Sequence, residues 1–134
     1  MADTGLKIGE VVERTGLSIP TLRHYDTVGL VTPSGRSPGG FRLYSEADVR
    51  RILLVRRMKP LGFTLDQMRE FLEAADTLQE AGDQQDSART QEDLGQAEAA
   101  ITGIQEEARS RYEKLRTQLT YAQEFLDLVD ELRS

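Results

Sequence analysis

The N-terminal half of the chain shows short helical patterns separated by turn-forming residues. Ile8, Val11 and Val12 lie at helical spacing within residues 6–14, which predicts a first short helix. Gly16 follows two residues after this stretch and favours a tight turn. The chain therefore begins its folded part with a short helix that is closely followed by another element.

The second helical pattern has clear signals at both ends. Ser18 is a favourable N-cap, Pro20 fits the first turn, and Gly29 can adopt the left-handed conformation just past the last turn. Apolar residues recur every three positions between these ends and predict a buried face: Leu22, Tyr25 and Val28.

The other side chains of this second helix are polar or basic. Thr21, Arg23 and His24 lie on or beside the face opposite the apolar one. Two short helices joined by a tight turn have the dimensions of a helix-turn-helix. A helical hairpin in another all-α protein can look the same, so these residues alone leave DNA binding and a purely structural role open.

Residues 31–44 change from a helical to an extended pattern. Glycine and proline recur through this stretch, and its last four residues alternate with period two, which predicts a glycine-rich hairpin. The alternation places Phe41 and Leu43 on an inward face.

The outward face of the hairpin then carries Arg42 and Tyr44, with Arg36 at the tip. All three side chains can donate hydrogen bonds to phosphate oxygens. The simpler interpretation is that Arg42 is only solvated.

Two further helices are predicted between residues 45 and 75. Ser45 and Thr64 each begin a capping-box sequence that precedes an apolar helical pattern. Pro60 is expected to end the earlier of these helices before it can continue.

Residues 87–132 predict one long amphipathic helix with a coiled-coil seam. The acidic stretch 76–86 before it is predicted to be a linker or an extension of the fourth helix. A helix of about 40 residues spans about 60 Å, which is too long for a domain of about 70 residues to cover. The expected seam is Leu94, Ile101, Ile104, Ala108, Tyr112, Leu115, Leu119, Ala122, Phe125, Leu126 and Val129.

An apolar stripe of this length needs a partner surface. A second copy of the chain is the simplest one, because it brings the same stripe. The alternative is that the long helix folds back on the N-terminal domain of its own chain.

The distribution of charge separates the two halves of the chain. Residues 1–75 hold 11 Lys and Arg against 9 Asp and Glu, whereas residues 76–134 hold 6 against 14. Within residues 23–59 the basic excess rises to 8 against 3. A basic module that faces phosphate, joined to an acidic module with another role, explains this asymmetry.

Several functional classes lack support. The 134 residues include no cysteine and one histidine, so neither disulfides nor a thiolate metal site is expected, and no metal or cofactor is predicted. There is no phosphate-binding glycine loop before a helix and no nucleophile-elbow sequence, so an enzyme is not expected. No signal segment or membrane-spanning run is present, which favours a cytoplasmic protein.

Several linked motifs in residues 6–75 resemble the DNA-binding domain of the MerR family of bacterial transcription regulators, in order and spacing. They are Ile8-Gly9-Glu10, Thr15-Gly16-Leu17-Ser18, Thr21-Leu22-Arg23-His24-Tyr25-Asp26, Gly29-Leu30, Gly40-Phe41-Arg42-Leu43-Tyr44-Ser45 and Leu61-Gly62-Phe63-Thr64-Leu65. The resemblance implies a winged-helix homodimer that binds a pseudo-palindromic promoter element and bends and untwists the DNA between the polymerase recognition boxes.

The resemblance also implies roles for individual residues. Thr21, Arg23, His24 and Tyr25 match the helix that meets the major groove and its flanking phosphates, while Arg42 and Tyr44 match the first wing. The long helix matches the family's antiparallel coiled coil. The full expected DNA-binding set is Ser18, Thr21, Arg23, His24, Tyr25, Arg36, Arg42, Tyr44 and Lys59.

We therefore expect a mainly α protein with four parts. Residues 1–5 form a loose terminus, 6–75 a winged helix-turn-helix domain, 76–86 a linker and 87–132 a dimerisation helix, with no separate effector domain. The expected partners are promoter DNA, a second copy and, through the DNA, RNA polymerase. The alternative is a coiled-coil interaction protein whose N-terminal domain contacts a protein instead of DNA.

The sequence leaves the effector of this expected regulator open. Family members that sense metals or oxidants use cysteines near the end of the long helix, and this chain has none. A small ligand, a sensor supplied by another protein, and no effector at all are the three alternatives.

Overall fold

The computed structural model describes residues 5–83 and 90–134. By its internal contacts the chain divides into two compact units, residues 1–72 and 73–134, and each is described by itself. The predicted fold class is confirmed, since helices dominate, a small sheet forms the wing, and a long helix ends the chain.

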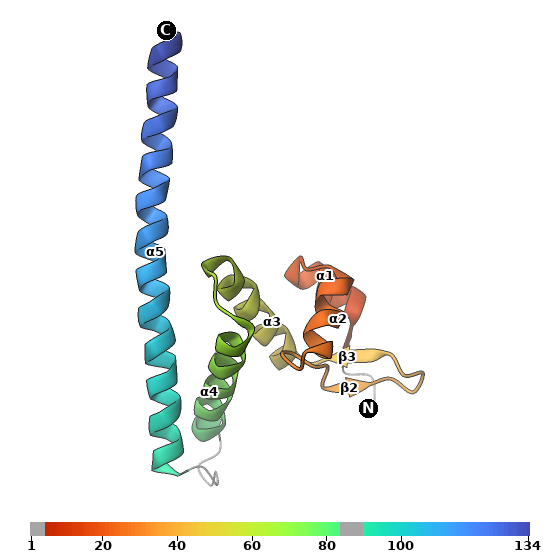
Figure 1. Cartoon of the computed structure of the whole chain (residues 1–134). Helices are drawn as coiled ribbons and strands as arrows, with labels where there is room; N and C mark the ends of the chain where they lie inside the picture. Colours follow the sequence, from red (N-terminus) through yellow and green to blue (C-terminus); the bar gives the residue numbers. More distant parts are fainter. Residues whose placement is uncertain (1–4, 84–89) are drawn as a thin grey trace. The chain divides into compact units, whose positions relative to one another are not determined.

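The described part of the first unit contains three short strands, three α-helices, a 3-10 helix and the first part of a fourth α-helix, in an order that begins with a strand (Figure 1). The elements are β1 Leu6–Lys7, α1 Ile8–Thr15, α2 Ile19–Thr27, β2 Gly35–Arg36, β3 Arg42–Tyr44, α3 Glu46–Met58, the 3-10 helix η1 Lys59–Leu61 and the first part of α4 Leu65–Asp83. The sheet is antiparallel with β3 between β1 and β2. The strand β1 was not predicted.

The helix α2 begins and ends as its sequence signals predict. The Ser18 hydroxyl oxygen accepts a hydrogen bond from the backbone N–H of Thr21 at 3.2 Å. Gly29 has φ +72°, and the N–H groups of Gly29 and Leu30 donate to the carbonyls of Asp26 and Tyr25 at 3.1 and 2.9 Å. This pair of bonds is a Schellman motif, which satisfies the last carbonyls of the helix.

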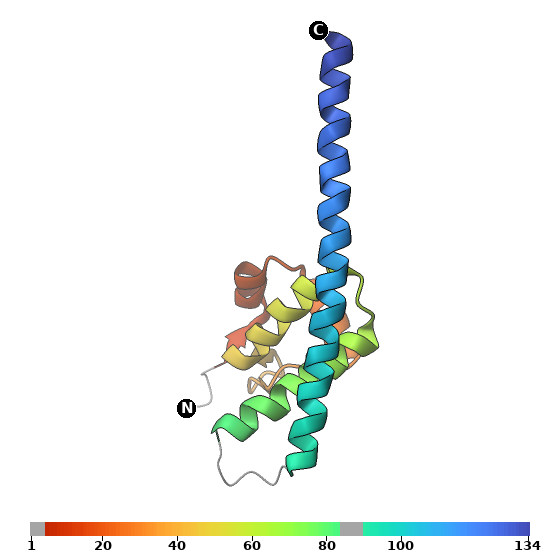
Figure 2. The same cartoon turned by 90° about the vertical axis from the view of Figure 1, so that its left-hand side faces the viewer.

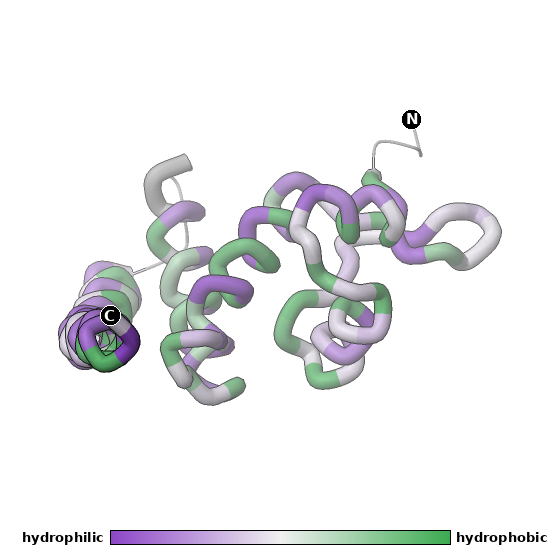
Figure 3. The backbone as a smooth tube through the Cα atoms, turned by 90° about the horizontal axis from the view of Figure 1, so that it is seen from above, coloured by the Kyte–Doolittle hydropathy of each residue, from purple (hydrophilic) through white to green (hydrophobic). Residues whose placement is uncertain are grey.

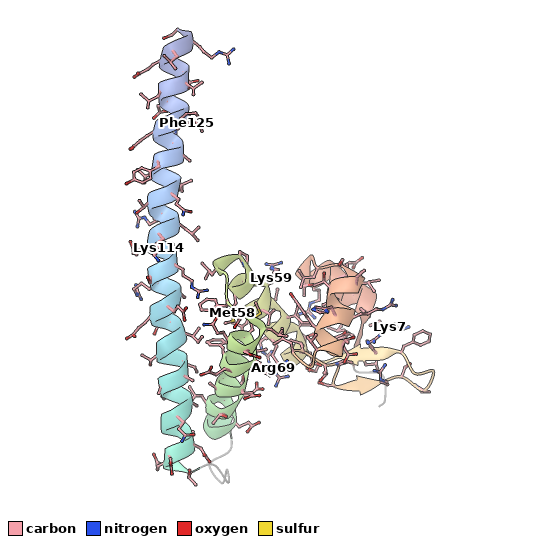
Figure 4. The ribbon with its side chains drawn as sticks, viewed as in Figure 1. Lys7, Met58, Lys59, Arg69, Lys114 and Phe125 are labelled. Atoms are coloured by element: carbon pink, nitrogen blue, oxygen red, sulfur yellow. The ribbon has the colours of Figure 1, made fainter. Side chains whose placement is uncertain are left out.

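The core of the first unit lies between α1, α2, α3 and the sheet. Its apolar members come from the α-helices, from β3 and from the segments that connect them, so the wing and the helix pair share one core: Val11, Leu22, Tyr25, Leu30, Val31, Leu43, Tyr44, Val49, Ile52, Val55, Met58, Phe63, Met68 and Leu72. Figure 4 labels Met58 at the end of α3.

A buried carboxylate joins the start of the wing to the start of α3. The side chain of Asp48 is 1% exposed. Its Oδ2 accepts hydrogen bonds from the N–H and the hydroxyl of Ser34 and from the N–H of Ser45, at 3.0, 2.6 and 2.9 Å. Oδ1 accepts a bond from Arg51 at 3.2 Å. Because Ser34 directly precedes β2, Asp48 fixes the base of the hairpin.

Pro60 ends α3 early, as predicted. The helix stops at Met58, and Lys59–Leu61 form a single 3-10 turn that Gly62 closes with φ +85°. Thr64 then begins α4 with the predicted capping box, since its hydroxyl accepts from the N–H of Gln67 at 3.1 Å.

The fourth helix continues beyond the predicted domain boundary. It runs to Asp83, so most of the stretch 76–86 extends α4, and the remainder lies outside the described residues. This corrects the linker interpretation in favour of its alternative, a helical extension.

The second unit is dominated by α5, Gln91–Arg133, which Figures 1 and 2 show as one continuous helix. Thr90 is its N-cap and accepts a hydrogen bond from the N–H of Asp93 at 3.0 Å. The predicted long helix is thus present from Gln91 onward, and residues 87–89 lie outside the described part. At about 1.5 Å per residue it is about 65 Å long.

Candidate nucleic-acid interface

The exposed face of α2 carries the polar residues that the sequence predicts. Arg23 and His24 are exposed, and no hydrogen bond or ion pair within residues 5–83 and 90–134 occupies the Arg23 guanidinium. The hydroxyls of Ser18 and Thr21 lie 2.9 Å apart and share a hydrogen bond at the start of the helix. Ser18 is therefore mainly a cap, while Arg23 is free to bind an external group.

The wing is a short hairpin that projects from the helices (Figure 1). Arg36 pairs with Arg42 across β2 and β3. At the tip, Ser37 donates its N–H to the carbonyl of Phe41 at 2.9 Å, and Gly40 has φ +84°. The hairpin thus places two positively charged side chains opposite each other on neighbouring strands.

One carboxylate of α2 contacts both wing arginines. Asp26 Oδ2 lies 2.8 Å from Nε of Arg42 and 3.8 Å from Nη2 of Arg36. The hydrogen bond from Arg42 to Asp26 holds the pKa of this guanidinium above its ordinary value, so it stays charged. Asp26 therefore connects the wing to the helix that carries Arg23.

The expected outward position of Tyr44 is wrong. Tyr44 is 1% exposed, and its buried hydroxyl has no hydrogen-bond partner among residues 5–83 and 90–134, whereas Phe41, expected inside, is 70% exposed. The reason is that β3 is the central strand and contacts both α1 and α3, so both of its faces are covered at its end. Burial raises the pKa of Tyr44.

Tyr25 is also a core residue. The sequence leaves it between a core position and a phosphate contact, and the structure buries it to 5% exposure. Burial raises the pKa of its hydroxyl. The exposed part of the interface accordingly consists of arginines and small polar side chains rather than tyrosines.

A groove of about 610 Å³ lies between the start of α1, the helix α2 and the wing. Arg23 and Arg42 line it together with Lys7 and the exposed ring of Phe41. Figure 4 shows Lys7 close to the wing. The groove also contains Glu10, whose Oε1 accepts from the backbone N–H of Lys7 at 3.3 Å. Sequence reasoning identified neither Lys7 nor Phe41 as part of this region.

The basic residues after the wing divide into structural and exposed ones. Arg56 donates to the carbonyl of Thr15 at the end of α1, and Arg69 donates to the carbonyl of Val28 at the end of α2 at 2.7 Å. Lys59 is exposed on the 3-10 turn (Figure 4). Part of the basic excess therefore caps helix ends and is not available to DNA.

The predicted dimerisation residues differ in exposure along α5. The first four and Val129 are half-buried and the others are exposed, with Leu119 at 70% and Phe125 at 65% exposure. Figure 3, which views α5 end-on, shows both hydrophilic and hydrophobic residues on this helix, and Figure 4 labels Phe125 and Lys114 on it. Tyr121 and Leu128 are exposed too and widen the apolar stripe beyond the predicted seam.

Two features of the described residues bear on other functions. No group of three or more histidine and acidic side chains in residues 5–83 and 90–134 could hold a metal ion. Within the same ranges no helix is both long and apolar enough to cross a membrane.

Comparison with family models decides the relationship. The model of the MerR HTH family regulatory protein matches residues 6–75, and the MerR DNA-binding model matches residues 49–110. The chain belongs to the MerR family. This family consists of DNA-binding transcription regulators, which are not enzymes, and nothing in the comparisons favours the protein-partner alternative.

Individual MerR-family proteins give the extent of the similarity. The chain is 33% identical over 104 residues to the HTH-type transcriptional regulator ZntR of Escherichia coli, covering 78% of this chain and 74% of that protein. It is 42% identical to the HTH-type transcriptional activator mta of Bacillus subtilis over 50% of this chain and 26% of mta. It thus spans about half or less of the length of several curated relatives.

A solved MerR-family structure matches nearly the whole chain. The crystal structure of MtaN, the N-terminal part of the Bacillus subtilis multidrug transporter activator, is 28% identical with a TM-score of 0.52. The match covers 94% of this chain and 95% of MtaN. The resemblance inferred from the sequence motifs is therefore confirmed at the level of family and fold.

Proposed function

We propose that the protein is a sequence-specific transcription regulator that binds a pseudo-palindromic promoter site as a homodimer and bends and untwists the DNA. The observation that carries the proposal is the hydrogen-bonded connection between α2 and the wing. This connection keeps Arg23 and Arg42 on the same groove. Arg23 lies on a helix that fits the major groove, and Arg42 lies on a hairpin that fits the sugar-phosphate backbone.

Within the proposed complex, α2 reads the bases. Thr21 is half-exposed and Arg23 is exposed on this helix. An arginine in the major groove can bind O6 and N7 of guanine with two hydrogen bonds. His24 and Ser18 lie on the same short helix or its cap and contact the flanking phosphates. The base contacts of Thr21 and Arg23 determine which half-site is bound.

The wing and the exposed lysine hold the sugar-phosphate backbone. Arg36 and Arg42 neutralise phosphates on one side of α2, and Lys59 does so from the 3-10 turn after α3. Such contacts fix the register of the protein on DNA without reading sequence. Tyr25 and Tyr44 support these residues from the core.

Dimerisation through α5 supplies the second half-site reader. Its exposed apolar side chains, such as Leu115, Leu119, Phe125 and Leu126, form a stripe that would be costly to leave in water. A second copy in antiparallel orientation buries this stripe in a coiled coil. The two α2 helices then match the two halves of a palindromic site.

The proposed regulator acts on RNA polymerase through the shape of the DNA. Bending and untwisting change the relative orientation of the two polymerase recognition boxes, and the cost of this deformation is repaid by contacts to both half-sites. The relatives named as a transcriptional activator and a transcriptional regulator support this assignment.

Titration of DNA binding with salt tests the proposal. Fluorescence anisotropy of a labelled 30-base-pair duplex is followed with the full-length protein at increasing potassium chloride. With several phosphates neutralised per protomer, log Kd is expected to change linearly with log salt, with a slope of about 0.9 per phosphate. Binding that is absent at low salt, or that does not weaken as salt rises, would exclude the proposal.

A further inference from the structure

Asp26 is an acidic residue directly beside the wing arginines that are proposed to bind phosphate. It lies in the last turn of α2, where the partial negative charge of the helix end disfavours a carboxylate. A carboxylate near the DNA backbone also repels phosphate. Both effects are unfavourable, so its place beside the wing calls for a compensating interaction.

That interaction is the hydrogen bond from Arg42. Nε of Arg42 donates to Oδ2 of Asp26 at 2.8 Å, and the side chains are 28% and 17% exposed. Arg36 lies farther from the same oxygen, at 3.8 Å, and is 52% exposed, while its Nη1 donates to the carbonyl of Gly40 at 3.3 Å. Asp26 thus contacts Arg42 closely and Arg36 only weakly.

The bond to Asp26 occupies one edge of the guanidinium. An arginine side chain has five N–H donors, one on Nε and four on the two Nη atoms. Asp26 takes the Nε–H, and within residues 5–83 and 90–134 no acceptor occupies the Nη donors of Arg42. The Nη end therefore remains available as a fork that can bind a phosphate in bidentate fashion.

We propose that Asp26 is a positioning residue that fixes the guanidinium of Arg42 so that its Nη fork faces a DNA phosphate in register with the bases read by α2. The inference rests on the proposed DNA-binding function. Because the wing tip is a short glycine-rich hairpin, Arg42 alone would sample several rotamers, and the loss of that freedom would reduce its contribution to binding. Asp26 removes this cost before DNA arrives.

Two other roles for Asp26 make different predictions. If the carboxylate only competed with phosphate for the arginines, its neutralisation would strengthen DNA binding. If it only stabilised the fold, its neutralisation would lower the melting temperature without changing the number of phosphates bound. Positioning requires weaker binding and a lower salt slope in a folded protein.

The test uses the full-length chain and the labelled 30-base-pair duplex. Asp26→Asn keeps the shape of the side chain and removes its charge. Asp66→Asn is the matched control, because Asp66 also pairs with an arginine, Arg69 at 3.2 Å, in the same unit but is 93% exposed. We expect Asp26→Asn to raise Kd about tenfold and to lower the salt slope by about 0.9 per protomer, and Asp66→Asn to change neither.

A double-mutant cycle shows whether Asp26 acts through Arg42. Arg42→Ala and the double variant Asp26→Asn/Arg42→Ala are expected to bind with the same Kd within about twofold, because the residue being positioned is gone. Arg42→Lys provides a second variant. It keeps the charge but has no Nε and no fork, so its Kd is expected to rise as in Asp26→Asn.

The outcomes separate this inference from the proposed function. If Asp26→Asn binds as tightly as the wild type or more tightly, or if its effect adds fully to that of Arg42→Ala, the positioning role is wrong. If Asp26→Asn does not fold, wild-type affinity in Arg42→Lys would overturn it. A wild-type chain without salt-dependent binding would instead overturn the proposed function itself.

Discussion

Replacing Asp48 with alanine is expected to destabilise the N-terminal unit strongly. The substitution removes a buried carboxylate that accepts four hydrogen bonds, from two groups of Ser34, from Ser45 and from Arg51. The N–H groups of Ser34 and Ser45, the Ser34 hydroxyl and the Arg51 guanidinium then lose the bond to this carboxylate in a partly buried place. The base of the wing and the start of α3 lose their connection as a result.

The bonds to Asp48 give the expected magnitude. A hydrogen bond to a charged group contributes about 1.5–3 kcal/mol, and neighbouring bonds are not additive. Loss of one partner of a buried charged cluster typically costs about 3–5 kcal/mol. A unit of about 70 residues has a free energy of unfolding of about 4–10 kcal/mol, so the variant is expected to lose about half of it or more.

Hydrogen exchange of the full-length protein measures this loss locally. Amides of α3 and the wing are expected to exchange about two to three orders of magnitude faster in Asp48→Ala, since 1.4 kcal/mol corresponds to a tenfold change. Asp66→Ala is the control, because this exposed carboxylate should change exchange by less than about 0.5 kcal/mol. Protection in Asp48→Ala equal to that of the control would refute the reasoning.

Three further expectations follow from the structure. Tyr44→Phe removes the buried, unpaired hydroxyl described above, so we expect the free energy of unfolding measured in urea to rise by about 1 kcal/mol and the DNA affinity to stay unchanged. Weaker DNA binding by this variant would show that the Tyr44 hydroxyl contacts DNA. The hydrogen bond from Arg14 lowers the pKa of Glu46, so this pair stabilises the fold above the ordinary glutamate pKa, and the contribution is lost as pH falls through the lowered value. Below about pH 4.3 the melting temperature of Glu46→Gln should therefore fall less than that of the wild type. Parallel profiles of melting temperature against pH would contradict this. Leu126→Asp should convert dimers to monomers in light scattering, whereas Thr120→Asp, on the polar face, should not; a dimeric Leu126→Asp would show that this seam is not the interface.

The ends of the helices could be predicted because their signals are local. The Schellman motif at Gly29 and the caps at Ser18, Thr64 and Thr90 each involve residues within five positions. The sequence places these groups together before any tertiary contact forms. Thr90 itself was not predicted as a cap, although its side chain is of a favourable type.

Features that depend on distant residues could not be predicted from the pattern. The strand β1 is only two residues long, and it exists because Leu6 pairs with Tyr44. The same pairing, with α1 and α3 against β3, buries Tyr44, although alternation alone places it outward. Coverage of both faces of a strand is a property of the fold, and period-two alternation does not reveal it.

The charges of the interface also divide into a part that the sequence reveals and a part that only the fold reveals. The basic excess in residues 23–59 agrees with the match to a family of DNA-binding regulators, but it does not show how each charge is used. Arg56 caps α1, and Arg42 binds Asp26 across 16 positions. Only the folded chain shows which arginines remain available to phosphate.

Genomic footprinting of the protein in its host cell tests the central claim most directly. We expect protection of a pseudo-palindromic site between the polymerase recognition boxes of a promoter, in the wild type but not in Arg42→Ala. Thr21→Ala should shift the preferred sequence of the site. Absence of any protected promoter site, or a footprint that Arg42→Ala leaves unchanged, would contradict the account.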